Sequence, residues 1–293
     1  MEQSELAITI ENGISFFSQI ESFNFSLKHI DIFDKLGAKN FEKIKAEAMK
    51  TNASFPYSRD FVKTSLEVNK REAVSFTEQI LESNSGKALL TLPIEKQAMD
   101  LFDGATLFHY DGEERTIIAS KIILFRTDLS YNALSLVHEN THILFNNPAP
   151  AKGFHIHYNE LLPILMELIA TMRFEETLRD PNLLKHYIDI RIKTLRDHIT
   201  EYMQGLQLRA AGVKNHIAME YSIHNSYSYI IAIIYALRLF ELYKEEPIAM
   251  KKWIQDAITH QRKVEDLLAD ANVSLKDKDT IKATEKVLKM YQK

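Results

Sequence analysis

Cysteine is absent from the 293 residues of this chain, and glycine and proline are scarce, with eight and seven residues. Without cysteine the protein can form no disulfide and has neither a thiolate metal ligand nor a cysteine nucleophile, so we expect a reducing, cytoplasmic location. Few glycines and prolines mean few tight turns, which favours long helices. Hydrophobic residues make up 45% of the chain, enough for a sizeable core.

An excess of positive charge and a long apolar run are also missing. The net charge is −4 and the pI is about 6.3, which argues against a general nucleic-acid partner. The longest uncharged apolar run, from Ser222 to Leu237, is shorter than the roughly 20 residues that a membrane span needs. The first residues lack the basic and apolar regions of a secretory signal. We therefore expect neither nucleic acid nor membrane as a partner.

Apolar residues recur at helical spacing along most of the chain. The ranges with this spacing are 38–53, 58–84, 157–179, 183–204, 212–244, 247–270 and 277–292. Residues 106–127 differ, because they are rich in β-branched residues and contain the turn pair Asp111-Gly112, which predicts a β-hairpin. Thr127 or Asp128 is then a candidate N-cap for a helix over residues 129–146.

No repeat, low-complexity tract or long linker divides the chain. We therefore expect a single domain over residues 1–293, mainly α with one small β-sheet or hairpin. Its expected regions are helical amino-terminal residues (1–90), the β-hairpin (106–127), a core (128–260) and carboxy-terminal helices (261–293).

The segment LSLVHENTHILF, residues 134–145, places two histidines and a glutamate in an otherwise apolar helix. His138 and His142 are four residues apart and project from one face, where both imidazoles can reach the same Zn²⁺. Glu139 lies at the edge of that face and can act on a metal-bound water as a general base. The spacing His-Glu-x-x-His is the zincin signature.

Two other interpretations of this segment need no metal: polar residues on a surface helix, or histidines satisfied within the core. The surrounding leucine, valine, isoleucine and phenylalanine residues make the helix apolar around most of its circumference, so we expect it to be buried. Buried imidazole and carboxylate groups need partners, and a metal ion supplies them. The sequence therefore favours the metal site.

A catalytic zinc site needs a third protein ligand. The metzincin pattern is excluded, because Phe145 and Pro148 stand where it needs glycine and histidine. The candidates that follow the motif are His155, His157, Glu160 and Glu167. The two glutamates are two turns apart on one face of an apolar helix, so one could bind the metal while the other orients a ligand histidine. Without a metal, Glu160 would simply be an acid favoured near a helix N-terminus.

A ferritin-like dimetal carboxylate site is a competing interpretation, since Glu139 and His142 also form a Glu-x-x-His pair. Such a site needs a second pair of this kind on another helix. Glu220 and His224 are four residues apart instead of three, and no other such pair occurs in the sequence. We therefore expect a single metal ion.

A further polar cluster lies in residues 219–235, MEYSIHNSYSYIIAIIY, which have the spacing of a helix. His224, Tyr227 and Tyr229 are close together there, and histidine or tyrosine side chains can donate hydrogen bonds to an oxyanion formed during hydrolysis. A single tyrosine at helical spacing is more often a core residue. The cluster together with a histidine favours a role in the site.

In this order the three elements resemble the M3 family of zinc oligopeptidases, in particular its oligoendopeptidase F branch, over roughly residues 115–260. IILFRTDLSYNALSLVHENTH is similar to the family's strand, loop and active-site helix. YNELLPILMELIAT is similar to its third-ligand helix, which implies Glu160 as the ligand and Glu167 as the residue behind a ligand histidine. IHNSYSYIIAIIYALRLFELYKEEP is similar to its His-and-Tyr helix, which implies that His224 and Tyr227 or Tyr229 contact substrate and oxyanion.

The chain would be a compact form of that family, because most of the family's amino-terminal region is missing. Inside its motif the family usually has an aromatic residue or leucine followed by glycine. In this chain Asn140 and Thr141 stand at these two positions. The resemblance implies a mainly α, gluzincin-type metallopeptidase fold with one small sheet. One Zn²⁺ is expected as cofactor, bound by His138, His142 and Glu160.

The expected activity is the hydrolysis of peptides by a metal-activated water, with Glu139 as the base and an oxyanion donor from the His-and-Tyr helix. An extended peptide could bind by edge pairing to the strand around residues 115–126. The alternative is a peptide-binding or scaffold protein that keeps this fold without catalysis. Glu139 speaks against that alternative, because metal binding alone does not require a base.

Overall fold

The computed structural model describes residues 32–51, 61–96, 104–110, 117–124, 128–146, 158, 160–212, 217–259 and 262–290. These ranges are mainly helical, which confirms the expected fold class at that level. The helices are α2 (Ile32–Leu36), α3 (Ala38–Met49), α4 (Leu66–Leu81), the 3₁₀ helix η1 (Asn84–Lys87), α5 (Ala88–Thr91), α6 (Tyr131–Asn146), α7 (Leu161–Thr177), α8 (Leu183–Ala210), α9 (Ile217–Glu245), α10 (Pro247–Ile258), α11 (Val264–Asp270) and α12 (Lys278–Met290).

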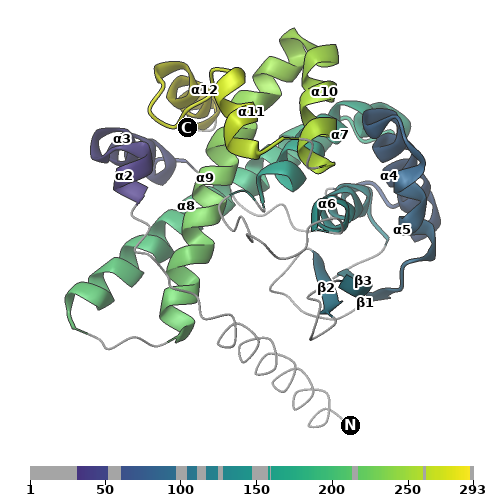
Figure 1. Cartoon of the computed structure of the whole chain (residues 1–293), viewed down its shortest axis with the longest axis horizontal. Helices are drawn as coiled ribbons and strands as arrows, with labels where there is room; N and C mark the ends of the chain where they lie inside the picture. Colours follow the sequence, from purple (N-terminus) through teal and green to yellow (C-terminus); the bar gives the residue numbers. More distant parts are fainter. Residues whose placement is uncertain are drawn as a thin grey trace.

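Helix α7 is the central element. All of its residues from Leu161 to Thr171 are buried, as expected of a helix that is apolar around its whole circumference. It packs against α6, α8 and α9, and α8 and α9 also pack along each other (Figure 1). Helix α6, which carries the His-Glu-x-x-His segment, is buried from Tyr131 to Ile143. The predicted burial of this segment is therefore confirmed.

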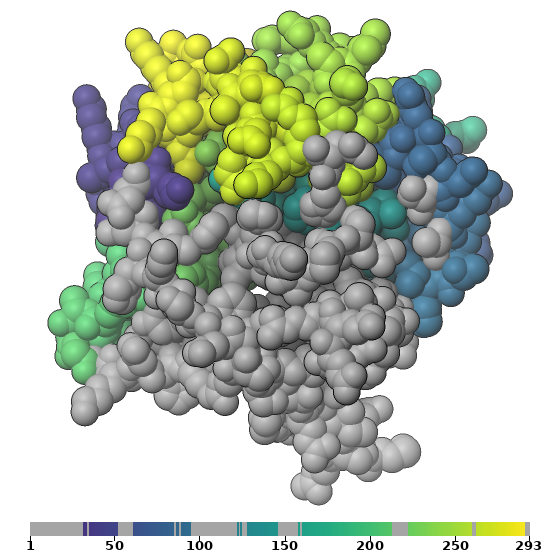
Figure 2. Space-filling view, in the orientation of Figure 1, coloured from purple at the N-terminus to yellow at the C-terminus, as the bar shows by residue number. Residues whose placement is uncertain are grey.

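The carboxy-terminal helices cover one side of this core. Helices α10 and α12 pack against α9, and α10 also contacts α4 and α6. In the space-filling view the yellow-green atoms of α10, α11 and α12 form a continuous layer next to the blue surface of α4 (Figure 2). Helices α4 and α10, which are far apart in the sequence, thus both pack against α6.

Several predicted helix boundaries need correction, among them the end of 183–204, since α8 continues to Ala210. Residues 247–270 form two helices, since Lys263 is extended and α11 folds back so that the Trp253 indole donates to the Leu267 carbonyl, at 2.9 Å. In the described residues 61–84, helix α4 begins only after Ser65, whose hydroxyl accepts a hydrogen bond from the Val68 N–H as an N-cap.

The start of α6 also differs from the prediction. Asp128 is not its N-cap, because the helix begins at Tyr131, and Thr127 lies outside the described residues. Residues 62–64 and 128–130 form a short antiparallel bridge in which the Asp128 carbonyl accepts from Thr64 N–H and Ser130 N–H donates to Val62. This bridge keeps the chain extended up to Ser130, so the helix starts later.

The strands are β1 (Ile94–Lys96), β2 (Gly104–Tyr110) and β3 (Ile117–Leu124), in the order β1-β3-β2. β3 pairs antiparallel with β2 and parallel with β1, and both β2 and β3 contact α6. The turn predicted at Asp111-Gly112 lies outside the described residues, so the hairpin connection stays a prediction.

The expected edge pairing of a peptide with this strand is limited at one end, and for residues 117–121 it stays a prediction. From Ile122 to Leu124, β3 is hydrogen-bonded on both sides and has no free edge there. A peptide that extends the sheet at that level could pair only with the outer edge of β1 or β2, because each strand offers just two rows of backbone groups.

Two further expectations concern the amino-terminal helices and the membrane. Within the range 1–90, which the sequence predicts to be helical, residues 1–31 and 52–60 lie outside the described residues. In the described ranges no helix is both long enough and apolar enough to span a bilayer.

The packing of α8 against α9 leaves no room for a side chain at Gly205. A Cβ atom at this position would overlap Cγ1 of Ile223 and lie 2.9 Å from its Cδ1. Ile223 is buried and β-branched, so its side chain has little freedom to move away.

We therefore expect Gly205→Ala to lower the free energy of unfolding by about 1–3 kcal/mol, the usual cost of overpacking a core. Urea denaturation followed by circular dichroism would measure this. Gln204→Ala, at the exposed neighbouring position of α8, is the control and should have little effect. Unchanged or increased stability of Gly205→Ala would contradict the tight packing of the two helices.

Candidate metal centre

The two histidines of the motif project from α6 toward the start of α7. His138 and His142 are each 8% exposed, and their Nε2 atoms lie 3.0 Å apart. The rings are inclined by 72°, so their nitrogens converge while the ring faces do not stack. The four-residue spacing on a helix thus brings both imidazoles to one point, as the sequence predicts.

Glu160 is the residue that immediately precedes α7. Its side chain makes no capping hydrogen bond to that helix. One carboxylate oxygen lies 3.3 Å from Nε2 of His138 and the other lies 3.6 Å from Nε2 of His142. This geometry therefore does not favour Glu160 as an acid that only stabilises the start of the helix, because the carboxylate is directed at the two imidazoles.

His138, His142 and Glu160 form a group that could hold a metal ion. Tetrahedral ligands at 2.0–2.1 Å from a Zn²⁺ lie about 3.3–3.4 Å from one another. Here the two Nε2 atoms are 3.0 Å apart, the two Glu160 oxygens lie 3.3 Å from one and 3.6 Å from the other, and one ligand atom from each residue lies within 4.8 Å of the others. Oε2 of Glu160 is also buried and accepts no well-aligned hydrogen bond. A buried carboxylate oxygen without a donor and two converging imidazole nitrogens fit a divalent cation.

Glu167 lies behind His138, one side chain away from this group. Its Oε2 is 2.8 Å from Nδ1 of His138, and the residue is only 1% exposed. Because a carboxylate can only accept, Nδ1 carries the proton and Nε2 keeps its lone pair for a cation. This is the arrangement expected for a residue that orients a ligand histidine.

Two residues of α8 complete the surroundings of Glu167. The Tyr187 hydroxyl donates to Oε2 at 2.8 Å, and Nη2 of Arg191 lies 2.8 and 3.0 Å from the two oxygens. The Arg191 guanidinium also lies over the Tyr187 ring, 4.9 Å from its centroid. The sequence prediction missed both residues. In the sequence they are indicated only by their spacing of four residues and by the presence of an arginine on an otherwise apolar helix face.

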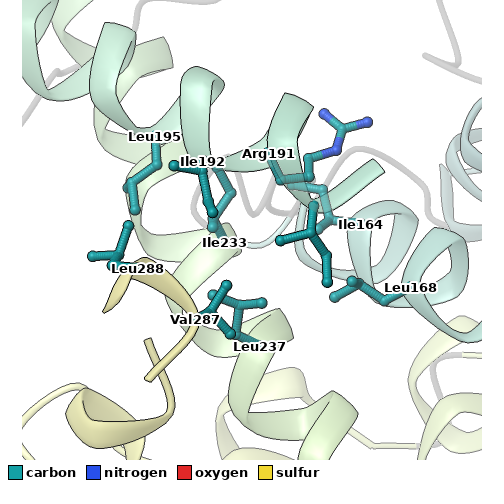
Figure 3. A pocket seen from close by; sticks show the side chains of 10 residues that line it. Ile164, Leu168, Arg191, Ile192, Leu195, Ile233, Leu237, Val287 and Leu288 are labelled. Atoms are coloured by element: carbon teal, nitrogen blue, oxygen red, sulfur yellow. The ribbon is translucent and has the colours of Figure 1, made fainter. Parts of the chain in front are cut away.

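The other side of Arg191 is apolar. A cavity of about 10 Å³, room for roughly one water molecule, is lined by side chains of α7, α8, α9 and α12. In Figure 3 the guanidinium points away from this cavity while Ile164, Ile233 and Leu237 face it. The charge of Arg191 is thus directed to Glu167 and not to the core.

Charges in the site shift the pKa values of its residues. Burial by itself lowers the pKa of His138, but the carboxylates of Glu167 and Glu160 outweigh it and raise this pKa from 6.5 to about 10. Burial tends to raise the pKa of Glu160, but His142 and His138 lower it to about 2. Arg191 and His138 likewise overcome burial and lower the pKa of Glu167.

Glu139, the predicted base, is 5% exposed on α6 between the two histidines. Its carboxylate is close enough to help raise the pKa values of both His138 and Tyr229. The two motif residues that the sequence left unexplained serve packing. Nδ2 of Asn140 lies 3.5 Å from the Thr77 hydroxyl of α4, and the Thr141 hydroxyl bonds the Val137 carbonyl of its own helix.

Tyr229 is the residue of the His-and-Tyr helix, α9, that the structure brings to Glu160. Burial, and after it the charge of the nearby Glu160 carboxylate, raise the pKa of Tyr229 well above 10. Tyr227 is fully buried and His224 is 9% exposed, and their predicted roles stay predictions. His155 and His157 lie outside the described residues.

Comparison with known proteins gives a similarity of fold. No protein-family model matches the sequence, and no curated protein matches it. The structure is similar to the crystal structure of a protein from Bacillus anthracis strain Ames that is assigned as an oligoendopeptidase F, with a TM-score of 0.57 and 13% identity over 89% of this chain. The chain spans 54% of that protein, about half its length. At this identity the similarity concerns the fold alone.

The hydrogen bond from His138 to Glu167 should control how tightly the site binds a cation. Glu167→Gln keeps the shape of the side chain but removes its charge, so we expect Zn²⁺ to bind about 10–100-fold more weakly. Competition with a chromophoric chelator would measure the Kd. Glu176→Gln, at an exposed position of the same helix, is the matched control. Equal affinities of the two variants would argue against this role of Glu167.

Cation binding should also compete with protons. Without a cation His138 holds a second proton up to about pH 10, and a ligand imidazole must release it. Near pH 7 we expect the release of about one proton per Zn²⁺, and an affinity that rises about tenfold per pH unit until the pKa is reached. Calorimetry in buffers of different ionisation enthalpy would count the protons. A binding enthalpy independent of the buffer would contradict this charge state.

Proposed function

We propose that this protein is a zinc-dependent metallopeptidase, with one Zn²⁺ held by His138, His142 and Glu160. The observation that carries the proposal is the convergence of these three side chains, with one ligand atom from each within 4.8 Å of the others and with Glu139 buried beside them. The fold shared with a protein assigned as an oligoendopeptidase supports it. We also propose that residues 1–293 form a single domain.

A Zn²⁺ in this site would lower the pKa of a bound water to about 7 and polarise a substrate carbonyl. Glu139 accepts the proton of the attacking water and passes it to the leaving amine, which a fixed carboxylate on the same helix face can do without moving. Glu167 keeps the His138 ring in place through the bond to Nδ1, and Arg191 keeps Glu167 ionised at neutral pH.

The oxyanion that forms on the scissile carbonyl needs hydrogen-bond donors. Tyr229 is the first candidate, because its phenol stays protonated at neutral pH and lies next to Glu160. His224 and Tyr227 are further candidates on the same helix, with the roles that the family resemblance implies.

The substrate we propose is a peptide. An extended peptide would pair with an edge of the sheet, since β2 and β3 contact α6, the helix that carries the motif. The scissile bond would have to reach Glu139 on that helix.

Glu139→Gln provides the test of this function. The amide has the size of the carboxylate but cannot accept the proton, so we expect peptide cleavage to fall at least about 100-fold while zinc binding persists. Cleavage of a fluorogenic peptide library would be measured together with the zinc content of each variant. Glu176→Gln is again the control and should cleave like the wild type.

Three results would be informative in different ways. Zinc binding with no cleavage by the wild type would favour the alternative of a non-catalytic peptide-binding protein. No zinc binding at all would refute the zinc site and, with it, any zinc-dependent function. Equal cleavage by the wild type and Glu139→Gln would refute the role of Glu139 and leave the metal site standing.

A further inference from the structure

A histidine outside the metal site lies against the ring of Tyr229. The imidazole of His198, on α8, is stacked on the phenol, with the ring centroids 4.5 Å apart and the planes inclined by only 13°. A parallel stack at this distance fixes the plane of the phenol ring, which is set by the torsion about its Cβ–Cγ bond. The ring of Tyr229 is thus held by a neighbouring helix as well as by its own.

The His198 ring is itself fixed by two polar partners. Its Nδ1 lies 3.1 Å from Oε2 of Glu201, one turn along α8, and 3.2 Å from the hydroxyl of Ser226 on α9. The Ser226 hydroxyl in turn donates to Oε2 of Glu201 at 3.0 Å. Both partners meet the same ring nitrogen. This differs from a serine-hydrolase triad, in which serine and acid bond opposite nitrogens of the histidine.

The position of this cluster follows from the packing of α8 on α9. His198 and Glu201 are three residues apart on one helix, and Ser226 and Tyr229 are three apart on the other, so each pair shares a face. The close approach of the two helices at Gly205 and Ile223 lies less than two turns farther along this interface. Ser226 is completely buried, so its hydroxyl is surrounded by this cluster and not by solvent.

We propose that His198 is a positioning residue, which holds the Tyr229 phenol beside Glu160 so that its hydroxyl can donate to the oxyanion of the substrate. This rests on the proposed peptidase function. His198 acts through the ring of Tyr229 and needs no contact with the substrate. Glu201 and Ser226 hold the imidazole at the correct rotation for the stack.

A double-mutant cycle tests the proposal. Tyr229→Phe should lower kcat about 100-fold or more, as loss of one oxyanion donor does. His198→Ala should lower kcat about tenfold with KM nearly unchanged, and His198→Phe, which restores a stacking ring, should recover most of this loss. In the Tyr229→Phe background, His198→Ala should cause no further loss, because residues that act as one unit are not additive. Thr200→Ala, exposed on the same helix, is the control.

A second measurement does not depend on catalysis. In protein labelled with 3-fluorotyrosine, the Tyr229 resonance can be assigned by its absence in Tyr229→Phe. The stacked imidazole should shift this resonance, and we expect His198→Ala to remove the shift while His198→Phe keeps it. Glu201→Gln, a milder change at a half-exposed position, should move the resonance in the same direction as His198→Ala.

Equal losses of kcat by His198→Ala in both backgrounds would overturn the proposal, and so would a Tyr229 resonance that does not respond to His198→Ala. If the wild type cleaves no peptide, the proposed function fails. The fluorine resonance then still decides whether His198 holds the ring.

Discussion

The fold around the candidate site depends on a buried negative charge that three helices share. Glu167 of α7 is fully enclosed, and a carboxylate in such a place is costly unless it is paired and hydrogen-bonded. Its partners come from α6 through His138 and from α8 through Tyr187 and Arg191. Removing Arg191 would leave the Glu167 charge without its countercharge, and removing His138 or Tyr187 would take away a hydrogen bond, so the mutual position of the three helices and the orientation of the metal-facing imidazole are set by the same contacts.

This constraint explains why the site needs more than its motif. The spacing of His138 and His142 on α6 and the place of Glu160 before α7 could be predicted from the sequence, because both follow from the geometry of one helix at a time. Tyr187 and Arg191 could not, because their role exists only once α8 lies against α7. An arginine on an apolar face was a signal, but nothing in the sequence says which buried acid it meets.

The errors have the same origin. Asp128 looked like the N-cap of α6, yet backbone pairing of residues 62–64 with 128–130 delays the helix to Tyr131. The strand at 117–124 looked free, yet β1 occupies one of its edges at Ile122–Leu124. In each case a partner distant in sequence, or the backbone itself, overrides the local preference.

The formal charges around the site indicate how a divalent cation can take the place of protons there. Glu139, Glu160 and Glu167 bring three negative charges into buried or half-buried positions, and Arg191 balances one of them. A proton on His138 balances a second, and the charge of His142, which lowers the pKa of Glu160, faces the third. A cation with two positive charges can replace protons on these imidazoles and leaves their Nε2 atoms available as ligands, so the carboxylates that bind, orient and accept protons can coexist in one apolar core. The arrangement of α6, α7 and α8 therefore suits an exchange of protons for a metal ion.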